Sequence, residues 1–310
     1  MRRVKETIFS IPFMRSLWTS LKKAARLPRF LGQFFAFRRM AGKERRSALR
    51  LRDLEPHLLD ATADTPFDPH YVYHPAWAAR VLAETRPVKH MDISSTLHFA
   101  AIASAFVPFE FYDYRPPQLG LEGLAVGHAD LTHLTFADES IASLSCMHTV
   151  EHIGLGRYGD PIDPEGDVKA MGELARVLAR GGALLFVVPV GGRPRIEFNA
   201  HRVYSYEQVV AAFPGLTLKE FSLVTDDGRF MRNASPSAAN RQEYGCGMFW
   251  FVKPLTNCPK GPFRQGIAQF PSEARTDDEA VFGNTARKAG QSRSRKVRNC
   301  VERGPFGQLS

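Results

Sequence analysis

Polar side chains stand at the ends of four short apolar runs in the middle of this 310-residue chain, namely Asp92, Asp113, Asp130 and His148. Ligands of open α/β sheets bind outside the carboxyl ends of the strands, so these four side chains are expected at one crevice. A carboxylate accepts hydrogen bonds from two hydroxyl donors in a fixed geometry, which suits a ligand with neighbouring hydroxyl groups. The alternative for any single aspartate is a turn or helix-cap residue.

Three histidines are candidates for a general base. His148 and His152 follow the apolar run 141–147, and His201 lies beyond the apolar run 183–190. An unperturbed imidazole has a pKa of about 6.5, so it can take a proton from a hydroxyl or amine near neutral pH. The alternative, for His152 in particular, is that the imidazole forms hydrogen bonds that hold its loop. Arg157, Tyr158 and Asp160, in the glycine-rich loop that follows, are candidates for binding the acceptor, with a structural role in the turn as the alternative.

The segment from His148 to His152 also spells H-x-x-E-H, a zinc pattern in which two histidines share a metal on one helix face. That pattern requires a helical setting and a third ligand. Here it follows a strand-like run and is closed by Gly154 and Gly156, so no metal is expected. The four cysteines lack C-x-x-C spacing, so neither a disulfide framework nor a cysteine zinc site is predicted.

The elements that would position these residues lie within residues 68–255. Short apolar runs alternate there with amphipathic stretches, which predicts a Rossmann-like α/β fold with a doubly wound, mostly parallel sheet. The expected helices cover 74–84, 97–105, 167–178 and 205–213, and the expected strands end near 93 and cover 109–112, 125–127, 141–147, 183–190, 216–224 and 247–253. Gly181 and Gly182 are expected to end the third helix. Ser205 and Gln208 form a capping-box pattern at the start of the fourth.

Four motifs follow one another between residues 129 and 190. They are an acidic residue before L-x-F (130–136), D-x-S before a strand (138–140), V-E-H-I at a strand end (150–153) and E-L-x-R-V-L-x-x-G-G-x-L-L-x-x-x-P (173–189). In this order they resemble class I S-adenosylmethionine-dependent methyltransferases. The runs HTVEHIGLGRYGDPIDPEGD and FNAHRVYSYEQV are similar to one branch of that superfamily, the DUF268 domain of unknown function.

The resemblance implies S-adenosylmethionine as the cofactor and assigns residues to it. Asp113, at the end of the second strand, would bind the ribose hydroxyls. Asp130 would pair with the adenine amino group, with the backbone of Leu131 beside the ring. Asp92 and Ser94, at the first strand and its loop, complete the implied cofactor site.

The first loop departs from the superfamily pattern. That loop is usually glycine-rich so that the backbone can approach the cofactor, whereas residues 91–98 read M-D-I-S-S-T-L-H. Ser94, Ser95 and Thr96 would either cap a helix and bind the methionyl carboxylate, or block the site. Two functions therefore stand: a methyltransferase acting on a small-molecule or glycan-like acceptor, or a non-catalytic scaffold of the same fold that binds partner proteins.

The positive charge of the chain lies at its two ends. The net charge is +9, yet residues 1–50 hold 14 Lys and Arg against two acidic residues, whereas residues 51–255 hold 17 against 25. A nucleic-acid-binding domain carries its positive charge on the folded body, so nucleic acid is not an expected partner.

The two ends differ in character. Residues 1–55 are predicted as a basic amphipathic extension, in which 8–39 would contact an anionic membrane surface or pack on the domain or a partner. Pro28 predicts two short helices there rather than one. Residues 256–310 are predicted as a basic, disordered tail. No segment reaches the roughly 18 apolar residues that span a bilayer. The scattered cysteines favour a reducing cytoplasm as the expected location, with peripheral membrane contact as an option.

Overall fold

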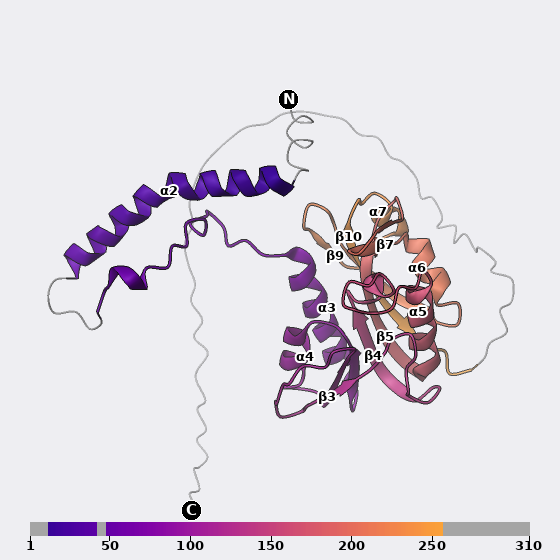
Figure 1. Cartoon of the computed structure of the whole chain (residues 1–310). Helices are drawn as coiled ribbons and strands as arrows, with labels where there is room; N and C mark the ends of the chain where they lie inside the picture. Colours follow the sequence, from indigo (N-terminus) through magenta and orange to yellow (C-terminus); the bar gives the residue numbers. More distant parts are fainter. Residues whose placement is uncertain (1–11, 42–47, 257–310) are drawn as a thin grey trace, which may run out of the picture. The chain divides into compact units, whose positions relative to one another are not determined.

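A computed structural model describes residues 12–41 and 48–256. Within these residues the main sheet has eight strands in the order β3-β2-β1-β4-β5-β10-β8-β9 (Figure 1). Their bounds are β1 His90–Ile93, β2 Phe109–Asp113, β3 Leu124–His128, β4 Ile141–Met147, β5 Leu178–Val190, β8 Thr217–Val224, β9 Phe230–Met231 and β10 Gly245–Val252. A separate hairpin pairs β6 (Arg195–Glu197) with β7 (His201–Val203).

Most of the sheet is parallel. The neighbours β3, β2, β1, β4 and β5 all run in one direction. Strand β10 is antiparallel to both β5 and β8, so β8 again points the same way as the central strands. Residues 184–190 of β5 and nearly all of β10 are buried, as expected for strands covered on both faces. The predicted fold, a doubly wound and mostly parallel sheet, is confirmed.

Helices cover both faces of this sheet. The alternate residues of β10 pack against different helices, because successive side chains of a strand point to opposite faces of the sheet. Met248 and Trp250 pack in one cluster with α3 (Pro69–Thr85) and α4 (Leu97–Ala103). Phe249 packs in the other cluster with α5 (Gly166–Val177) and α6 (Tyr206–Ala212). The carboxyl ends of the parallel strands are thus held between two layers of helices.

Side-chain caps fix the starts of α6 and α3. At α6 the predicted capping box is confirmed: the Gln208 N–H donates to Ser205 Oγ at 3.1 Å, and the Ser205 N–H donates to Gln208 Oε1 at 2.9 Å. Helix α3 starts five residues before its predicted beginning, because the Asp68 carboxylate accepts from the N–H groups of His70 and Tyr71. This earlier start brings His70 onto the helix.

The predicted end of α5 at residue 178 lies within one residue of the observed end, but the role given to Gly181 and Gly182 as its stop was wrong. The helix ends at Val177 and β5 begins at the next residue, so both glycines lie inside the strand. Gly181 has φ +73°, and a side chain on Gly182 would meet the Ala179 carbonyl oxygen at 2.7 Å. The glycines therefore permit an irregular start to β5. The short elements β6, β7, β9 and α7 (Pro236–Ala239) carry no periodicity and were not predicted.

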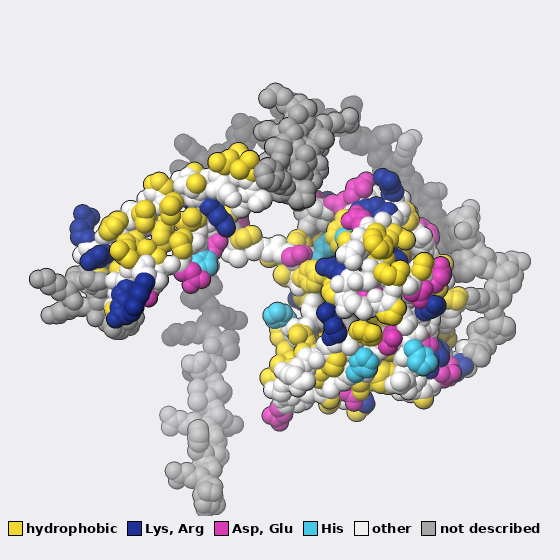
Figure 2. Space-filling view, in the orientation of Figure 1, with side chains coloured by type: hydrophobic (Ala, Val, Ile, Leu, Met, Phe, Trp, Pro, Cys, Tyr) yellow, Lys and Arg dark blue, Asp and Glu magenta, His cyan; other side chains and the backbone are white. Residues whose placement is uncertain are grey.

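The basic extension forms one long helix, α2, over Pro12–Met40. The prediction of two short helices was wrong, since Pro28 lies inside α2, and Figure 1 shows the helix bending along its length. Many of its apolar side chains are exposed beside basic ones (Figure 2), including Leu17, Trp18, Leu21, Leu27, Leu31, Phe35 and Phe37. Among the described helices, none is both long and apolar enough to cross a bilayer. The predicted tail lies outside the described residues, apart from Thr256.

Candidate functional site

A cavity of about 320 Å³ opens at the carboxyl ends of the parallel strands. The chain runs from β1 outward through β2 and β3 and then returns to place β4 on the other side of β1. Ligands of open α/β sheets bind at such a reversal of strand order. The lining residues come from the loops that follow β1, β2, β3 and β4, and they include Ser94, Asp113, Asp130, Leu131, His148 and His152.

A wider hollow of about 760 Å³ lies at the other end of the strands. It is lined by residues near the starts of β4 and β5, among them Ile141 and Gly181, together with charged residues such as Lys89 and Glu110. None of the four predicted strand-end residues, Asp92, Asp113, Asp130 and His148, lines it. We therefore place the candidate site in the smaller cavity, at the carboxyl ends.

The structure brings Asp113, Asp130 and Leu131 together at this cavity. Asp113 Oδ1 accepts the Arg115 N–H at 2.7 Å, and Asp130 Oδ1 accepts both the N–H and the hydroxyl of Thr132, at 2.8 and 2.7 Å. Each aspartate thus also shapes the turn in which it lies. The turn role and a ligand role coexist, because a carboxylate has two oxygens and about four acceptor positions.

The glycine-free first loop adopts a shape that usually needs glycine. Ser94 has φ +59°, in the left-handed region, and its N–H donates to the Tyr112 carbonyl at 2.8 Å. The Thr149 hydroxyl donates to the Ser94 carbonyl at 2.7 Å. Thr96 caps α4, with its side chain accepting the Phe99 N–H, as the sequence predicted for this segment. Serine therefore replaces glycine here while the backbone keeps the tight turn.

Asp92 does not line the cavity. Its side chain is fully buried, where it accepts the Ser95 N–H at 3.0 Å and the Ser145 hydroxyl. Burial raises the pKa of Asp92 to about 6. His90 continues this network, with Nε2 2.9 Å from Ser145 Oγ and Nδ1 2.7 Å from Ser143 Oγ, and burial lowers its pKa to about 3. The network joins β1 to β4 beneath the loops that carry the site.

His148 lies at the end of β4 with both ring nitrogens engaged. Its φ is +55°, and its N–H donates to the Val187 carbonyl at 2.8 Å. Nδ1 is hydrogen-bonded to Glu151 Oε1 at 2.8 Å, and Nε2 lies 3.3 Å from Cys246 Sγ. Burial lowers the pKa of His148 to about 4 and raises that of Glu151 to about 7. His148 is thus a neutral imidazole near neutral pH.

His152 lines the cavity, and its Nε2 lies 3.9 Å from Glu151 Oε1. Nδ1 donates to the Ala200 carbonyl at 2.6 Å, which fixes the proton on Nδ1 and leaves a lone pair on Nε2. Burial lowers the pKa of His152, which favours the neutral base. His201 is not among the residues that line the cavity; its Nε2 lies 3.3 Å from Glu197 Oε2 and its ring packs on Tyr244.

Sequence reasoning missed several residues that line the cavity beside the predicted ones. Tyr114, Arg115 and Thr132 follow Asp113 and Asp130, so the same strand-end rule would have found them. Tyr158 and Asp160, which the sequence offered as acceptor-binding candidates, also line the cavity. The guanidinium groups of Arg115 and Arg157 lie over the Tyr158 ring, 5.0 and 5.1 Å from its centroid. This cation–π stack forms one rim of the cavity.

The H-x-x-E-H segment does not form the helical zinc motif. Only Val150–His152 are helical, as a single 3₁₀ turn, and His148 precedes that turn. Both described cysteines, Cys146 and Cys246, are buried free thiols.

One protein family and several solved structures are similar to this chain. Residues 131–228 match a family described as Caenorhabditis protein of unknown function, DUF268. The matched residues make up about a third of the chain. Both sequence runs that resembled this family lie inside the matched residues, so the DUF268 prediction is confirmed. No curated protein matches the chain.

Several solved structures are similar to this chain. The N-methyltransferase NodS of Bradyrhizobium japonicum in complex with S-adenosyl-L-homocysteine shares 16% identity, with coverage of 63% of this chain and 94% of NodS and a TM-score of 0.44. YcgJ of Bacillus subtilis shares 16% identity over 58% of this chain and 99% of YcgJ, with a TM-score of 0.41. The [4+2]-cyclase SpnF shares 14% over 59% of this chain and 82% of SpnF, with a TM-score of 0.43. The strand order described above, rather than these distant similarities, establishes the fold.

Proposed function

We propose that the protein is an S-adenosylmethionine-dependent methyltransferase that acts on a small-molecule or glycan-like acceptor. One observation supports this most: Asp113, Asp130 and Leu131, from the ends of two adjacent strands, line a single cavity at the reversal of strand order. The cavity volume of about 320 Å³ is near the lower end of the roughly 300–1,000 Å³ common for ligand sites. A nucleoside-sized cofactor would fill it.

The residues present fit the parts of the cofactor. The Asp113 carboxylate would accept hydrogen bonds from the ribose hydroxyls, and Asp130 would accept from the adenine amino group, with Leu131 beside the ring. Ser94, at the turn after β1, would offer its hydroxyl and the nearby backbone to the methionyl end. The left-handed backbone of Ser94 supports this assignment, because it gives the loop the tight turn that glycine gives elsewhere.

His152 is the base that we assign to the reaction. The bound cofactor supplies an electrophilic methyl group, and the acceptor oxygen or nitrogen must lose a proton as the new bond to the methyl carbon forms. His152 Nε2 would take that proton, while the hydrogen bond from Nδ1 to the Ala200 carbonyl holds the ring in the required tautomer. Orientation of the acceptor at about 3–3.5 Å supplies the rest of the rate enhancement. His148 is less suited, since both of its nitrogens are engaged.

The acceptor would approach past the rim formed by Tyr158. Its aromatic face and the flanking Arg115 and Arg157 suit a hydroxylated ring, which stacks on aromatic side chains and binds guanidinium donors. The exposed apolar and basic side chains of α2 further suggest that the acceptor is met at an anionic membrane surface.

Isothermal titration calorimetry with S-adenosylhomocysteine tests the proposal. We expect one site per chain with micromolar affinity, and Asp113→Asn should weaken binding at least ~30-fold because one charged acceptor of two hydroxyl bonds is lost. Glu122→Gln, on an exposed loop outside the cavity, is the matched control and should bind like the wild type. Absence of heat at millimolar ligand from a folded protein would favour the alternative function, a non-catalytic scaffold.

A further inference from the structure

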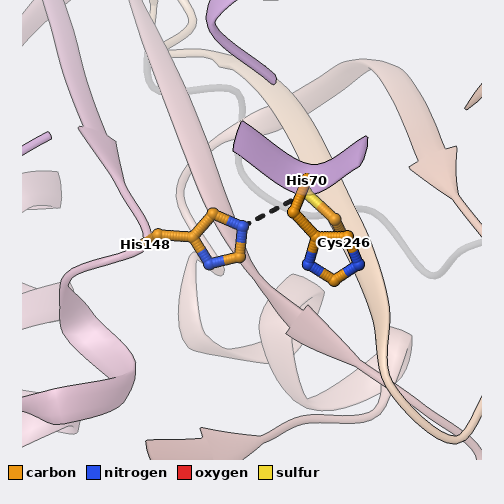
Figure 3. A group of neighbouring side chains, drawn as sticks. All are labelled: His70, His148 and Cys246. Atoms are coloured by element: carbon orange, nitrogen blue, oxygen red, sulfur yellow. Dashed lines mark hydrogen bonds between the residues drawn. The ribbon is translucent and has the colours of Figure 1, made fainter. Parts of the chain in front are cut away.

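Three side chains of the types that ligate transition metals lie close together next to the cavity. His70 lies in the first turn of α3, His148 at the end of β4 and Cys246 in β10. One ligand atom from each of the three lies within 4.8 Å of the others. Figure 3 shows His148 directing a ring nitrogen at the Cys246 sulfur, with the His70 ring beside that sulfur. Segments far apart in the sequence thus meet at one point.

We propose that His70, His148 and Cys246 bind a transition-metal ion, of which zinc is the best fit. A thiolate and two imidazoles form a donor set that selects zinc over the hard cations magnesium and calcium, which prefer oxygen ligands. Three protein ligands leave a fourth position for water or another group. The H-x-x-E-H segment contributes only its first histidine as a ligand.

The surroundings of His148 match those of a metal-binding histidine. Such a histidine usually donates its second ring N–H to a carboxylate, which fixes the tautomer and raises the basicity of the ligating nitrogen. Here Glu151 Oε1 lies 2.8 Å from Nδ1, while Nε2 faces the Cys246 sulfur. The left-handed backbone at His148, with φ +55°, holds the ring in this position at a cost in conformational energy.

Two buried polar atoms beside the cluster provide independent support. His74 Nε2 and Glu151 Oε2 are two of the four buried side-chain atoms without a hydrogen-bond partner among the described residues; the others are His201 Nε2 and Trp250 Nε1. The His74 and Glu151 side chains are essentially inaccessible to solvent, and the His74 ring lies 5.0 Å from that of His148. Leaving such groups unsatisfied in a protein interior is costly. A bound cation would compensate the buried Glu151 carboxylate through His148, and a water on the ion is a natural partner for His74.

An acidic opening gives the ion a route from solvent. His70 is only partly buried and lines a surface pocket together with Tyr244, Asp68, Asp226 and Glu243. Carboxylates around an opening raise the local concentration of cations. The His70 ring also stacks on Tyr244, with centroids 5.4 Å apart, which holds the ligand in place.

Binding would release one proton and join three elements. The Cys246 thiol must lose its proton to solvent as the metal–sulfur bond forms, whereas the two imidazoles bind through lone pairs that they already carry. The ion would then link α3, β4 and β10 and fix the position of His148, which also lines the cavity. The site is therefore expected to stabilise the fold around the cavity whether or not methyl transfer occurs.

Metal binding by the full-length chain tests the proposal without any activity assay. Reduced, tag-free protein is stripped with a chelator, loaded with Zn²⁺ and passed over a desalting column before metal analysis. We expect one zinc per chain, and with Co²⁺ in place of Zn²⁺ we expect the visible and near-ultraviolet bands of a tetrahedral thiolate site. Cys246→Ser and His70→Gln should each weaken Zn²⁺ binding at least ~100-fold, and Glu151→Gln roughly 10–100-fold.

Cys146→Ser is the matched control, because Cys146 is the other buried thiol within the described part of the chain and lies outside the cluster. His70 is partly exposed, so His70→Gln should fold even if Cys246→Ser does not. Zn²⁺ should raise the unfolding temperature of the wild type and of Cys146→Ser, but not of His70→Gln. Zinc retained in full by folded His70→Gln, or no stoichiometric zinc in the wild type, would overturn the proposal.

Discussion

Backbone strain marks the residues that shape the site. Ser94 and His148 are both held in the left-handed region, directly after β1 and β4. For residues other than glycine this conformation costs about 1–2 kcal/mol each. Hydrogen bonds from Thr149 to the Ser94 carbonyl and from the His148 N–H to Val187 help to offset that cost. The sequence could not reveal either feature, because the strain is imposed by the strands that flank each turn.

Replacing the proposed base should separate chemistry from binding. We expect His152→Gln to lower kcat by roughly 10²- to 10⁴-fold, since it removes the proton acceptor, while the affinity for S-adenosylhomocysteine stays within about threefold of the wild type. The assay measures S-adenosylhomocysteine release with the best acceptor from a panel of sugars and small amines. An unchanged kcat would show that His152 only holds its loop, through the bond to Ala200.

The buried network at β1 and β4 should make stability depend on pH. Burial lowers the pKa of His90 in the folded protein to about 3. As the pH falls below about 6.5, the His90 imidazole is therefore protonated in the unfolded chain while it is still neutral in the folded protein. His90 therefore lowers stability progressively between pH 6.5 and 3, by up to about 1.4 kcal/mol per pH unit. Asp92 acts oppositely: with its pKa raised to about 6, its contribution is largest below pH 4 and is lost as the pH rises through 6.

His90→Gln isolates the histidine part of that dependence. Urea unfolding at several pH values between 7 and 5 should give a slope of stability against pH that is smaller than in the wild type by about 1 kcal/mol per unit. His98→Gln, at an exposed position on α4, should leave the slope unchanged. Equal slopes in His90→Gln and the wild type would contradict the assigned burial effect.

At the scale of elements, the sequence predicted the helices and strands whose apolar pattern is strong. The runs at 141–147 and 183–190 are buried strands, and the capping box at Ser205 starts a helix as expected. Gly181 and Gly182 were assigned to the end of α5, whereas they lie inside β5 and permit its irregular start. The continuity of α2 through Pro28 was missed because the flanking residues favour helix strongly enough to continue it.

Helix α2 should bind anionic membranes through its basic side chains. Each such residue contributes about 1 kcal/mol near a charged surface, so replacing Lys22, Lys23 and Arg29 by Gln should weaken binding to phosphatidylserine-containing vesicles roughly 100-fold. Co-sedimentation of the full-length chain measures this. Replacing the exposed Arg80, Arg193 and Arg241 by Gln is the matched control. Equal losses in both variants would indicate non-specific attraction, and no binding to vesicles would leave packing on a protein as the role of α2.

At the scale of the whole molecule, the two proposed sites differ in how far the sequence predicts them. The cavity could be predicted, since strand-end residues of a parallel sheet share one edge, and Asp113 and Asp130 do so. The metal cluster could not, because His70, His148 and Cys246 meet only when α3 packs on the sheet. His70 and Cys246 also lie outside the matched DUF268 segment, so that family's motif does not include them.

The central claim is that the crevice after β1, β2 and β3 binds an adenosyl group. A crystal structure of the full chain grown with S-adenosylhomocysteine tests it most directly. The ribose hydroxyls should then lie within hydrogen-bond distance of the Asp113 carboxylate, and the adenine should lie beside Leu131 with its amino group at Asp130. Ligand density elsewhere on the protein, or an empty crevice at saturating ligand, would contradict the account.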